Sequence, residues 1–450
     1  MRRIRCPLPG EQGGPARSHH GQSVHTILPF RFHGKESLLN ATDHQRRLDS
    51  YRNPQDRTTR SHDMNRKIFG LSPILLDPTS GLRRESPRAP EFRQPDFDER
   101  FDSETLFYDV FRHPDRSTIM MIGPSLYNLA SLFDDIEIRA FPSGSVCRFR
   151  RYDLDRLTRV EVDAPAGTSE IVLRANKHEL HGKVSPPETA DYKSLRVLYA
   201  ISKNNDITWI CDWARFNRDV HGAQALLIYD NQSTDYRVDE LLHQLGKIDG
   251  LAFVGVVPLP FRFGPPGLGL RKSWDSNFLQ IGSLELARWR FLLDARSFLN
   301  TDIDELVLGR DGASVFEAAE RSGLVRFYGK WVPNIRDDTV DQTGRNVPRH
   351  ANFSHVETMR ASRWPLLRDF CQPKWAVAPR RVPAKAHMTH HRIKSWWRSR
   401  LWNPNFSFRH FRGLSTGWKY DRGQRETFDP QRHSLDGAMK EAFARVRWNE

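Results

Sequence analysis

The chain lacks several features that would place its 450 residues in a familiar class. It has no apolar run near the roughly 20 residues of a membrane-spanning helix, and its basic N-terminus precedes no apolar segment typical of a secretory signal. Four widely spaced cysteines without a C-x-x-C argue against a disulfide framework or a zinc ribbon. We therefore expect a cytoplasmic protein of a reducing compartment, with peripheral attachment to a membrane left open.

Catalytic signatures that would fix a mechanism are also missing. G-x-S-x-G and H-E-x-x-H are absent, which gives no support to a hydrolase triad or a zinc protease. The glycine-rich run at 264–272 matches neither G-x-G-x-x-G nor a Walker A loop. A function must therefore rest on the arrangement of several weaker motifs.

What the chain has in excess is positive charge, concentrated near its C-terminal end. The formal net charge is +14, and residues 380–432 contain 13 Lys or Arg but only 3 Asp or Glu. Such an imbalance favours an anionic partner, which includes nucleic acid, membrane phosphate, a sugar nucleotide or an acidic glycan.

The sequence divides into four regions. Residues 1–100 are rich in Arg, His, Pro, Ser and Asp without apolar periodicity, so we expect them to be disordered. Residues 101–190 contain segments that alternate apolar and polar residues, which predicts a small β-rich module without a recognisable catalytic motif. Residues 191–430 form the main domain, and residues 431–450 a C-terminal helix and tail.

Short apolar runs alternate with helical segments in the main domain. Strands are predicted at 195–201, 223–229 and 251–257, helices at 206–220, 235–245 and 273–295, and a fourth strand just before Asp302. This alternation is typical of an α/β fold with a mainly parallel sheet flanked by helices. Ligands of such sheets bind at the carboxyl ends of the strands. The polar clusters 202–205, 230–235 and 302–304 follow three of these strands, and we expect them to converge on one edge.

The acidic pair Asp302 and Asp304 is the central motif. Alternating residues of an extended segment lie on one side, so the two carboxylates would face the same way. Oxygen ligands of this kind suit Mg²⁺ or Mn²⁺, with a diphosphate and waters completing the coordination. The alternative is a strand that ends in a solvated acidic turn. Glu305 is expected to support the loop and not to hold the ion.

Asp230 is the last residue of a buried strand, so its carboxylate needs a compensating partner. A ribose hydroxyl or a base N–H would be suitable. In the same loop, Ser233, Thr234 or Asp235 is expected to cap the helix that follows.

Taken together, these motifs resemble the GT-A glycosyltransferases, in particular the family 2-like and family 92 group, over residues 195–425. Lys203-Asn204-Asn205 is similar to a K-N-E segment whose acid is replaced here by Asn205. The run 230–235 matches a D-N-x-S-T-D element, and 302–305 matches a D-x-D-E element. The run 389–395 is similar to an N-H-Y-x-x-K-S element in its His, Lys and Ser, without the Asn and Tyr.

The resemblance implies a GT-A (Rossmann-like) fold that transfers a sugar from a nucleoside-diphosphate sugar to a saccharide or glycoconjugate acceptor, with inversion. The residues implied in donor binding are Ser202, Lys203, Asp230 and Asp235, of which Asp230 would contact the nucleoside. The metal ligands would be Asp302, Asp304 and His390.

Catalysis in such an enzyme is electrostatic. The ion, Mn²⁺ or Mg²⁺, would stabilise the charge that develops on the diphosphate, with Asp304 holding it and Lys394 neutralising the phosphates. Inversion also needs a carboxylate base for the acceptor hydroxyl. The candidates are Asp337, Asp338, Asp341 and Glu357, in the stretch after the sheet, and the sequence does not choose among them.

Two other classes stay open. The same acidic pair would serve a metal-dependent phosphotransferase or nuclease. The basic segment alone would suit a non-enzymatic binding protein for nucleic acid or acidic glycan. For the transferase we expect no specific nucleic-acid partner, and the basic C-terminal region is the candidate for peripheral membrane contact.

Overall fold

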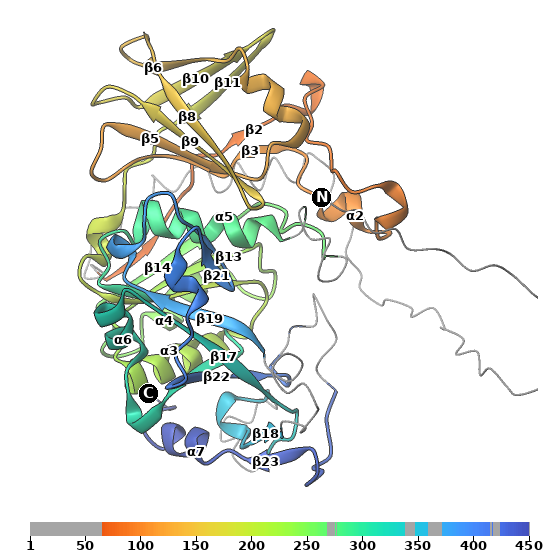
Figure 1. The fold of residues 1–450 in the computed structure, drawn as a ribbon, viewed down its shortest axis with the longest axis vertical. Helices are drawn as coiled ribbons and strands as arrows, with labels where there is room; N and C mark the ends of the chain where they lie inside the picture. Colours follow the sequence, from red (N-terminus) through yellow and green to blue (C-terminus); the bar gives the residue numbers. More distant parts are fainter. Residues whose placement is uncertain are drawn as a thin grey trace, which may run out of the picture. The chain divides into compact units, whose positions relative to one another are not determined.

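The computed structural model describes residues 65–267, 275, 277–337, 347–358, 371–414, 416 and 424–449 (Figure 1). All of these residues belong to one compact unit. The fold is α/β with a large, mostly parallel central sheet, and a β-rich module precedes most of that sheet in the chain.

The parallel half of the main sheet consists of strands predicted from the sequence and one that was not. The predicted strands are β12 (Arg196–Ser202), β13 (Ala225–Asp230), β14 (Phe253–Pro258) and β15 (Ser297–Asn300). Their spatial order is β14-β13-β12-β15, and β1 (Arg66–Ile68) extends it beside β14 in parallel. The polar clusters that follow β12, β13 and β15 therefore lie at the same edge of the sheet, where the parallel strands end.

The other half of the sheet is mixed. It contains β19 (Cys371–Val377), β17 (Leu324–Val332), β22 (Phe406–Phe411) and β16 (Glu305–Gly309), in that order after β15. The pairs β15–β19, β17–β19 and β16–β22 are antiparallel, whereas β17 and β22 are parallel. Strands far apart in the sequence thus become neighbours beside the acidic turn.

Helices cover both faces of the sheet because side chains alternate along each strand. Leu198 on β12 faces a core shared with α3 (Ile207–His221), α4 (Val238–Leu245) and α6 (Val315–Ser322). Tyr199, the next residue, faces a second core with α5 (Phe278–Leu286). Helix α3 begins after Asp206, whose carboxylate accepts a hydrogen bond from the Thr208 N–H at 2.7 Å.

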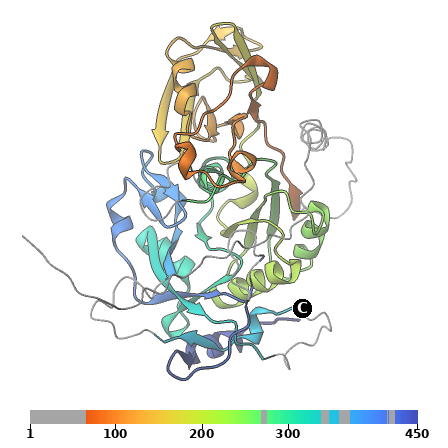
Figure 2. The same cartoon turned by 90° about the vertical axis from the view of Figure 1, so that its right-hand side faces the viewer.

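Every residue of α5 is buried because the helix has the sheet on one side and the β-rich module on the other (Figures 1 and 2). Its chain continues into a π-helical turn, Ala287–Phe291. A Cβ added at Gly282 would lie 2.6 Å from the ring of Tyr108, so the absence of a side chain there permits the close packing. The Arg290 guanidinium forms a buried ion pair with Asp109, with 2.6 Å between Nη1 and Oδ2.

The β-rich module contains two four-stranded sheets, and the strands expected within 101–190 are present. One sheet has the order β4 (Asp109–Arg112), β5 (Thr118–Gly123), β9 (Leu157–Asp163), β8 (Phe149–Leu154); the other has β11 (His178–Lys183), β10 (Glu170–Ala175), β6 (Glu137–Phe141), β7 (Ser145–Val146). A short pair, β2 (Ile74–Leu75) and β3 (Thr105–Phe107), packs against the module's core.

Disorder throughout residues 1–100 was expected, and this is wrong for 66–100. Strand β1 belongs to the main sheet, and Phe69 is buried. Buried arginines organise the rest. Arg84 donates to the carbonyls of Ser125, Asp102 and Thr105, and Arg88 forms a bidentate ion pair with Asp275. Hydrogen bonds and ion pairs of polar side chains hold much of this segment in place, and a search for apolar periodicity does not detect them.

The remaining elements are short. They are η1 (Pro78–Ser80), η2 (Pro90–Phe92), α2 (Phe97–Arg100), η3 (Tyr127–Phe133), η4 (Thr189–Tyr192), η6 (Arg310–Gly312), η8 (His350–Asn352), η9 (Pro379–Arg381), η10 (Trp397–Arg400), β18 (His355–Glu357), β20 (His387–Thr389), β21 (Arg392–Lys394), β23 (His433–Leu435) and α7 (Gly437–Phe443). Helix α7 is the helix expected in the C-terminal tail. Among the described residues, no helix combines the length and apolarity needed to cross a bilayer.

Candidate functional site

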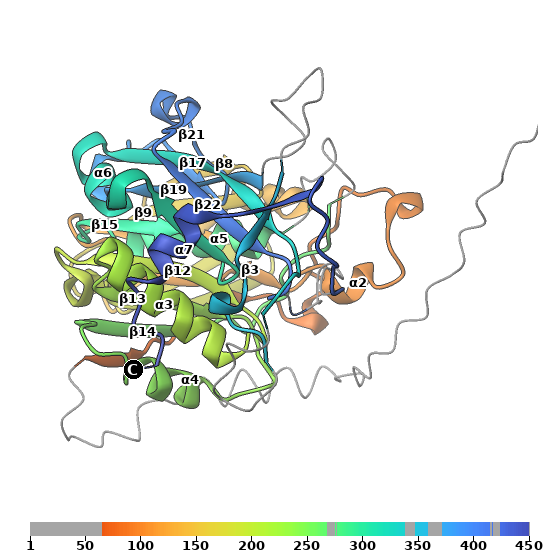
Figure 3. The same cartoon turned by 90° about the horizontal axis from the view of Figure 1, so that it is seen from below.

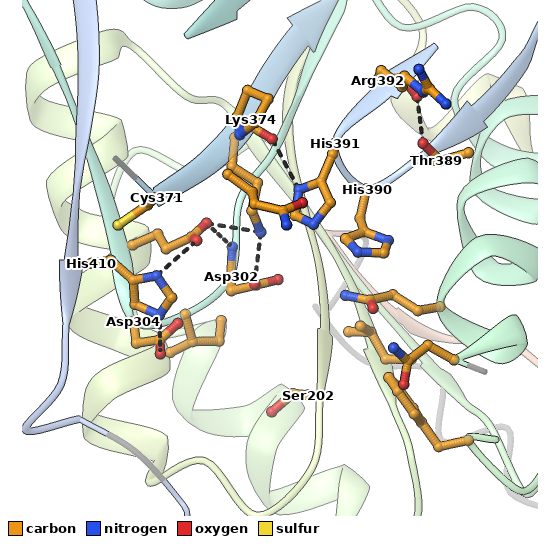
Figure 4. A pocket seen from close by; sticks show the side chains of 18 of the residues that line it. Ser202, Asp302, Asp304, Cys371, Lys374, Thr389, His390, His391, Arg392 and His410 are labelled. Atoms are coloured by element: carbon orange, nitrogen blue, oxygen red, sulfur yellow. Dashed lines mark hydrogen bonds and ion pairs between the residues drawn. The ribbon is translucent and has the colours of Figure 1, made fainter. Parts of the chain in front are cut away.

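A cavity of about 880 Å³ opens at the carboxyl ends of the parallel strands (Figure 4). Its lining includes Ser202 and Lys203 at the end of β12, the turn after β15, and residues of β17, β19 and the β20–β21 hairpin. Six Lys or Arg side chains and four Asp or Glu side chains line it: Arg156, Lys203, Arg326, Lys374, Arg392 and Lys394, and Asp155, Asp302, Asp304 and Glu305. This composition suits an anionic, hydroxyl-rich ligand.

The acidic turn joins β15 to β16 and is held from within. Glu305 accepts a hydrogen bond from the Asp302 N–H at 3.0 Å, which is the loop-supporting role expected for it. Lys374 on β19 completes the arrangement, with its Nζ 2.6 Å from Asp302 Oδ2 and 2.9 Å from Glu305 Oε2. The Lys374 ammonium group thus binds the carboxylates of Asp302 and Glu305 at once.

Burial governs the electrostatics of this group. The side chains of Lys374 and Glu305 are 2% exposed, whereas that of Asp302 is 39% exposed. Burial raises the pKa of Glu305 above its ordinary value, opposed by Lys374. Burial by itself would lower the pKa of Lys374, but Asp302 and Glu305 raise it above its ordinary value. Lys374 therefore stays charged and fixes the position of Asp302.

Asp304 has a different partner, His410 on β22. Its Oδ2 lies 3.1 Å from His410 Nε2, and His410 Nδ1 lies 3.5 Å from Glu305 Oε1 (Figure 4). Although burial opposes protonation, Asp304 raises the pKa of His410 well above its ordinary value. The ring also stacks on Trp331, with 4.3 Å between centroids. Among the histidines of the basic segment, His410 was not the one predicted from the sequence, because only the antiparallel register of β16 and β22 brings it opposite Glu305.

His390, predicted as a metal ligand, lines the same cavity beside His391, with 4.0 Å between ring centroids. Within the described ranges, no three His, Cys, Asp or Glu side chains are grouped closely enough to hold a metal ion. The histidine at the acidic pair is His410, not His390. Two carboxylates facing a cavity fit Mg²⁺ or Mn²⁺ that brings phosphate oxygens and waters, and they do not fit a cage made entirely of protein ligands.

The predicted donor-binding residues separate into two groups. Ser202 and Lys203 line the cavity. Asp230 is buried outside its lining, where it accepts hydrogen bonds from the Tyr236 hydroxyl at 3.3 Å and the Ser233 N–H at 3.2 Å. Burial raises its pKa, opposed by Ser233. The chain itself thus compensates the buried carboxylate for which a ligand partner had been considered. Asp235 is exposed and lies outside the lining.

The loop 230–235 does not cap α4, which corrects a second expectation. The helix begins at Val238, and Arg237 precedes it without a side-chain cap. The polar residues of this loop instead bind the loop after β12. Asn204, in the left-handed region at φ 53°, donates its N–H to Ser233 Oγ at 2.9 Å and accepts from the Thr234 N–H at 2.7 Å. The two strand ends are therefore tied to each other.

Lys394, predicted to neutralise a diphosphate, is bound to a residue of the β-rich module. Its Nζ lies 2.6 Å from Oδ2 of Asp155, at the tip of the β8–β9 hairpin. Arg156, the next residue, has a positive φ of 59° and also lines the cavity. Burial would raise the pKa of Asp155, but Lys394 and Arg156 lower it. No sequence signal pointed to this hairpin, which contributes to the cavity from outside the main domain.

None of the carboxylates predicted as the base for the acceptor hydroxyl lines the cavity among the described residues. Asp338 and Asp341 lie outside the described residues. Glu357 is on β18, away from the cavity lining, and pairs with Arg412 at 2.7 Å. Asp337 does not line the cavity either. Among described carboxylates, Asp155 lines it independently of the acidic turn.

Comparison with known proteins adds no assignment. No protein-family model matches this chain, and a search of curated proteins found no match.

Proposed function

We propose that this chain is a divalent-metal-dependent glycosyltransferase of the GT-A type, which moves a sugar from a nucleoside-diphosphate sugar to a saccharide or glycoconjugate. The observation that carries the proposal is the Asp302–Asp304 turn, which follows the fourth parallel strand and faces a cavity rich in Lys and Arg. The strand order β14-β13-β12-β15 supports the Rossmann-like part of this assignment.

In this proposal the donor lies across the strand ends. Ser202, Lys203 and Asn231 line the part of the cavity formed by β12 and β13, where the nucleoside would bind. The loops tied by Asn204 form this wall before any ligand arrives. Asp230 acts by holding its loop through Ser233 and Tyr236, and not by touching the nucleoside.

The diphosphate would lie at the acidic turn. Asp302 and Asp304 would hold Mn²⁺ or Mg²⁺, which would supply Lewis-acid stabilisation of the charge on the departing nucleoside diphosphate. Lys374 and His410 hold the two carboxylates of the turn in place. Lys203 and Arg326 add positive potential around the leaving group, which favours the bond cleavage electrostatically.

The acceptor hydroxyl must lose a proton as it attacks the anomeric carbon and the bond from that carbon to the diphosphate breaks. Asp155 replaces Glu357 as the candidate to receive the proton, because it lines the cavity. Its ion pair with Lys394 keeps it ionised, so it can accept a hydrogen bond from the hydroxyl.

The test is whether the protein binds a nucleoside diphosphate. Binding is detected as a rise in the melting temperature, measured with and without Mn²⁺. We expect stabilisation only when both are present, and release of nucleoside diphosphate from a panel of nucleotide sugars. Asp304→Ala should abolish both effects, whereas Asp311→Asn, at an exposed position with positive φ, should change neither. Stabilisation by random-sequence DNA that is steeply salt-dependent and indifferent to Asp304→Ala would favour a binding protein instead.

A further inference from the structure

Exposed apolar side chains gather at one place after the β20–β21 hairpin. Trp397, Leu401 and Trp402 are 63%, 56% and 57% exposed. The other large apolar residues with comparable exposure in the described ranges are scattered along the chain: Ile68, Phe92, Val146, Phe428 and Leu435. We call the three clustered residues the tryptophan patch. Two indoles and a leucine within six positions are an unusual surface for a soluble domain.

The fold holds the tryptophan patch outward. The 3₁₀ turn η10 is anchored by Ser399, whose buried hydroxyl accepts a hydrogen bond from the Ile393 N–H at 2.9 Å. After the turn, the Asn403 N–H donates to the Arg326 carbonyl at 2.8 Å. Trp402 makes an edge contact with Tyr328, with 5.9 Å between centroids. These bonds fix the backbone on both sides, so the exposure belongs to the folded chain.

Along the chain, the charged residues next to the patch have one sign. Arg398 and Arg400 are interleaved with the apolar residues, and the chain has no Asp or Glu between Asp369 and Asp421. The Arg398 guanidinium lies over the Trp397 ring at 5.0 Å, and its Nη1 donates to the Ser322 carbonyl at 3.1 Å. Arg400 is exposed. A partner that covers this surface must be both apolar and anionic.

We propose that the tryptophan patch docks on a membrane surface containing anionic phospholipids. Indole rings favour the headgroup level of a bilayer, where the ring is apolar and its N–H remains hydrated. Leu401 would enter the acyl boundary, and the arginines would pair with lipid phosphates. An acidic polymer would use the arginines but leave the leucine without an apolar contact, so the combination favours a lipid surface.

The geometry also places the membrane next to the cavity. Strand β21 contributes Arg392 and Lys394 to the cavity lining, and the patch begins three residues after Lys394. Figure 3 shows β21 at the periphery of the ribbon. Docking through η10 would therefore bring lipid headgroups near the side of the cavity that β21 lines. The docking itself does not depend on the proposed function.

Co-sedimentation with vesicles tests the proposal. The full chain is mixed with vesicles of phosphatidylcholine alone, or of phosphatidylcholine with phosphatidylglycerol, and its indole emission is recorded in parallel. We expect the protein to sediment with the anionic vesicles and its emission to shift to the blue, since indoles leave water. Trp397→Ser with Trp402→Ser should weaken sedimentation at least about tenfold and remove the emission shift.

Two further variants separate charge from insertion. Arg400→Gln should weaken binding about fivefold on anionic vesicles, because a surface arginine contributes about 1 kcal/mol there. Leu435→Ser, at a 74% exposed position on β23, is the matched apolar control and should bind as the wild type does. Unchanged melting temperatures confirm that each variant is folded.

Several outcomes would overturn the proposal. They are no sedimentation of the wild type with anionic vesicles, equal losses for Leu435→Ser and the double tryptophan variant, or displacement by soluble polyglutamate without an emission shift. The last result would assign the surface to an acidic polymer. None of these results would affect the test of nucleoside-diphosphate binding, so the two proposals fail separately.

Discussion

Replacing Lys374 by methionine should cost the protein a large part of its stability. The substitution keeps the length of the side chain but removes the cation bound to Asp302 and Glu305. Breaking a buried ion pair by removing one partner costs ~3–5 kcal/mol, since the remaining charge is buried without compensation. Asp302 is 39% exposed and can be hydrated, so its share is small. Glu305 dominates because it is buried, but His410 remains 3.5 Å from it, so we expect a loss at the low end of that range, about 3 kcal/mol in the free energy of unfolding.

Urea unfolding followed by far-UV circular dichroism measures this loss. Lys385→Met is the control, because that side chain is exposed and should change the free energy of unfolding by no more than about 0.5 kcal/mol. Glu305→Gln in the Lys374→Met background should recover part of the loss, since the orphaned buried charge is then gone. Additive effects of the two substitutions, or a Lys374→Met variant as stable as Lys385→Met, would refute this account of the cluster.

Three further predictions follow from single contacts. The His221 Nε2–H donates a hydrogen bond to the Val307 carbonyl at 2.8 Å, and burial of the ring lowers its pKa to about 4 from 6.5. Below pH 6.5 the unfolded chain binds a proton that the folded chain does not, so stability is lost as the pH falls toward 4. The drop in free energy of unfolding between pH 7 and pH 5 should therefore be about 2 kcal/mol smaller in His221→Asn than in the wild type. Asp155→Asn should leave Mn²⁺-dependent nucleoside-diphosphate binding within about twofold but lower transfer to the acceptor at least about 100-fold, the low end for a general base; equal transfer rates would exclude Asp155. Glu357→Gln should retain full transfer activity, because its partner is Arg412, and a kcat below a tenth of the wild-type value would restore it as a candidate base.

The parallel half of the sheet was predictable because its strands are continuous apolar runs between helices. The mixed half was not. Strands β19 and β22 pair with β15 and β16 over sequence separations that no local pattern encodes, and these pairings bring Lys374 and His410 to the acidic turn. Glu305, Lys374 and His410 lie together, but they come from three strands, β16, β19 and β22, that are far apart in the sequence.

Prediction from residue types was weakest where polar groups bind each other. Asp230 was expected to need a ligand, and it is held by Ser233 and Tyr236. Ser233, Thr234 or Asp235 was expected to cap a helix that in fact begins at Val238. In both cases the residue types correctly predicted a turn. Several turn conformations can satisfy the same hydrogen-bonding groups, however, and only the tertiary contacts determine which conformation forms.

The β8–β9 hairpin has a consequence for how this chain can change its selectivity. Its tip reaches the cavity, while its strands are built into a separate sheet with their own core. Substitutions at Asp155 and Arg156 can therefore alter one wall without disturbing the strand ends or the acidic turn. If the proposed function holds, exchanging this tip would change the acceptor that the cavity takes and leave the binding of the nucleotide unchanged.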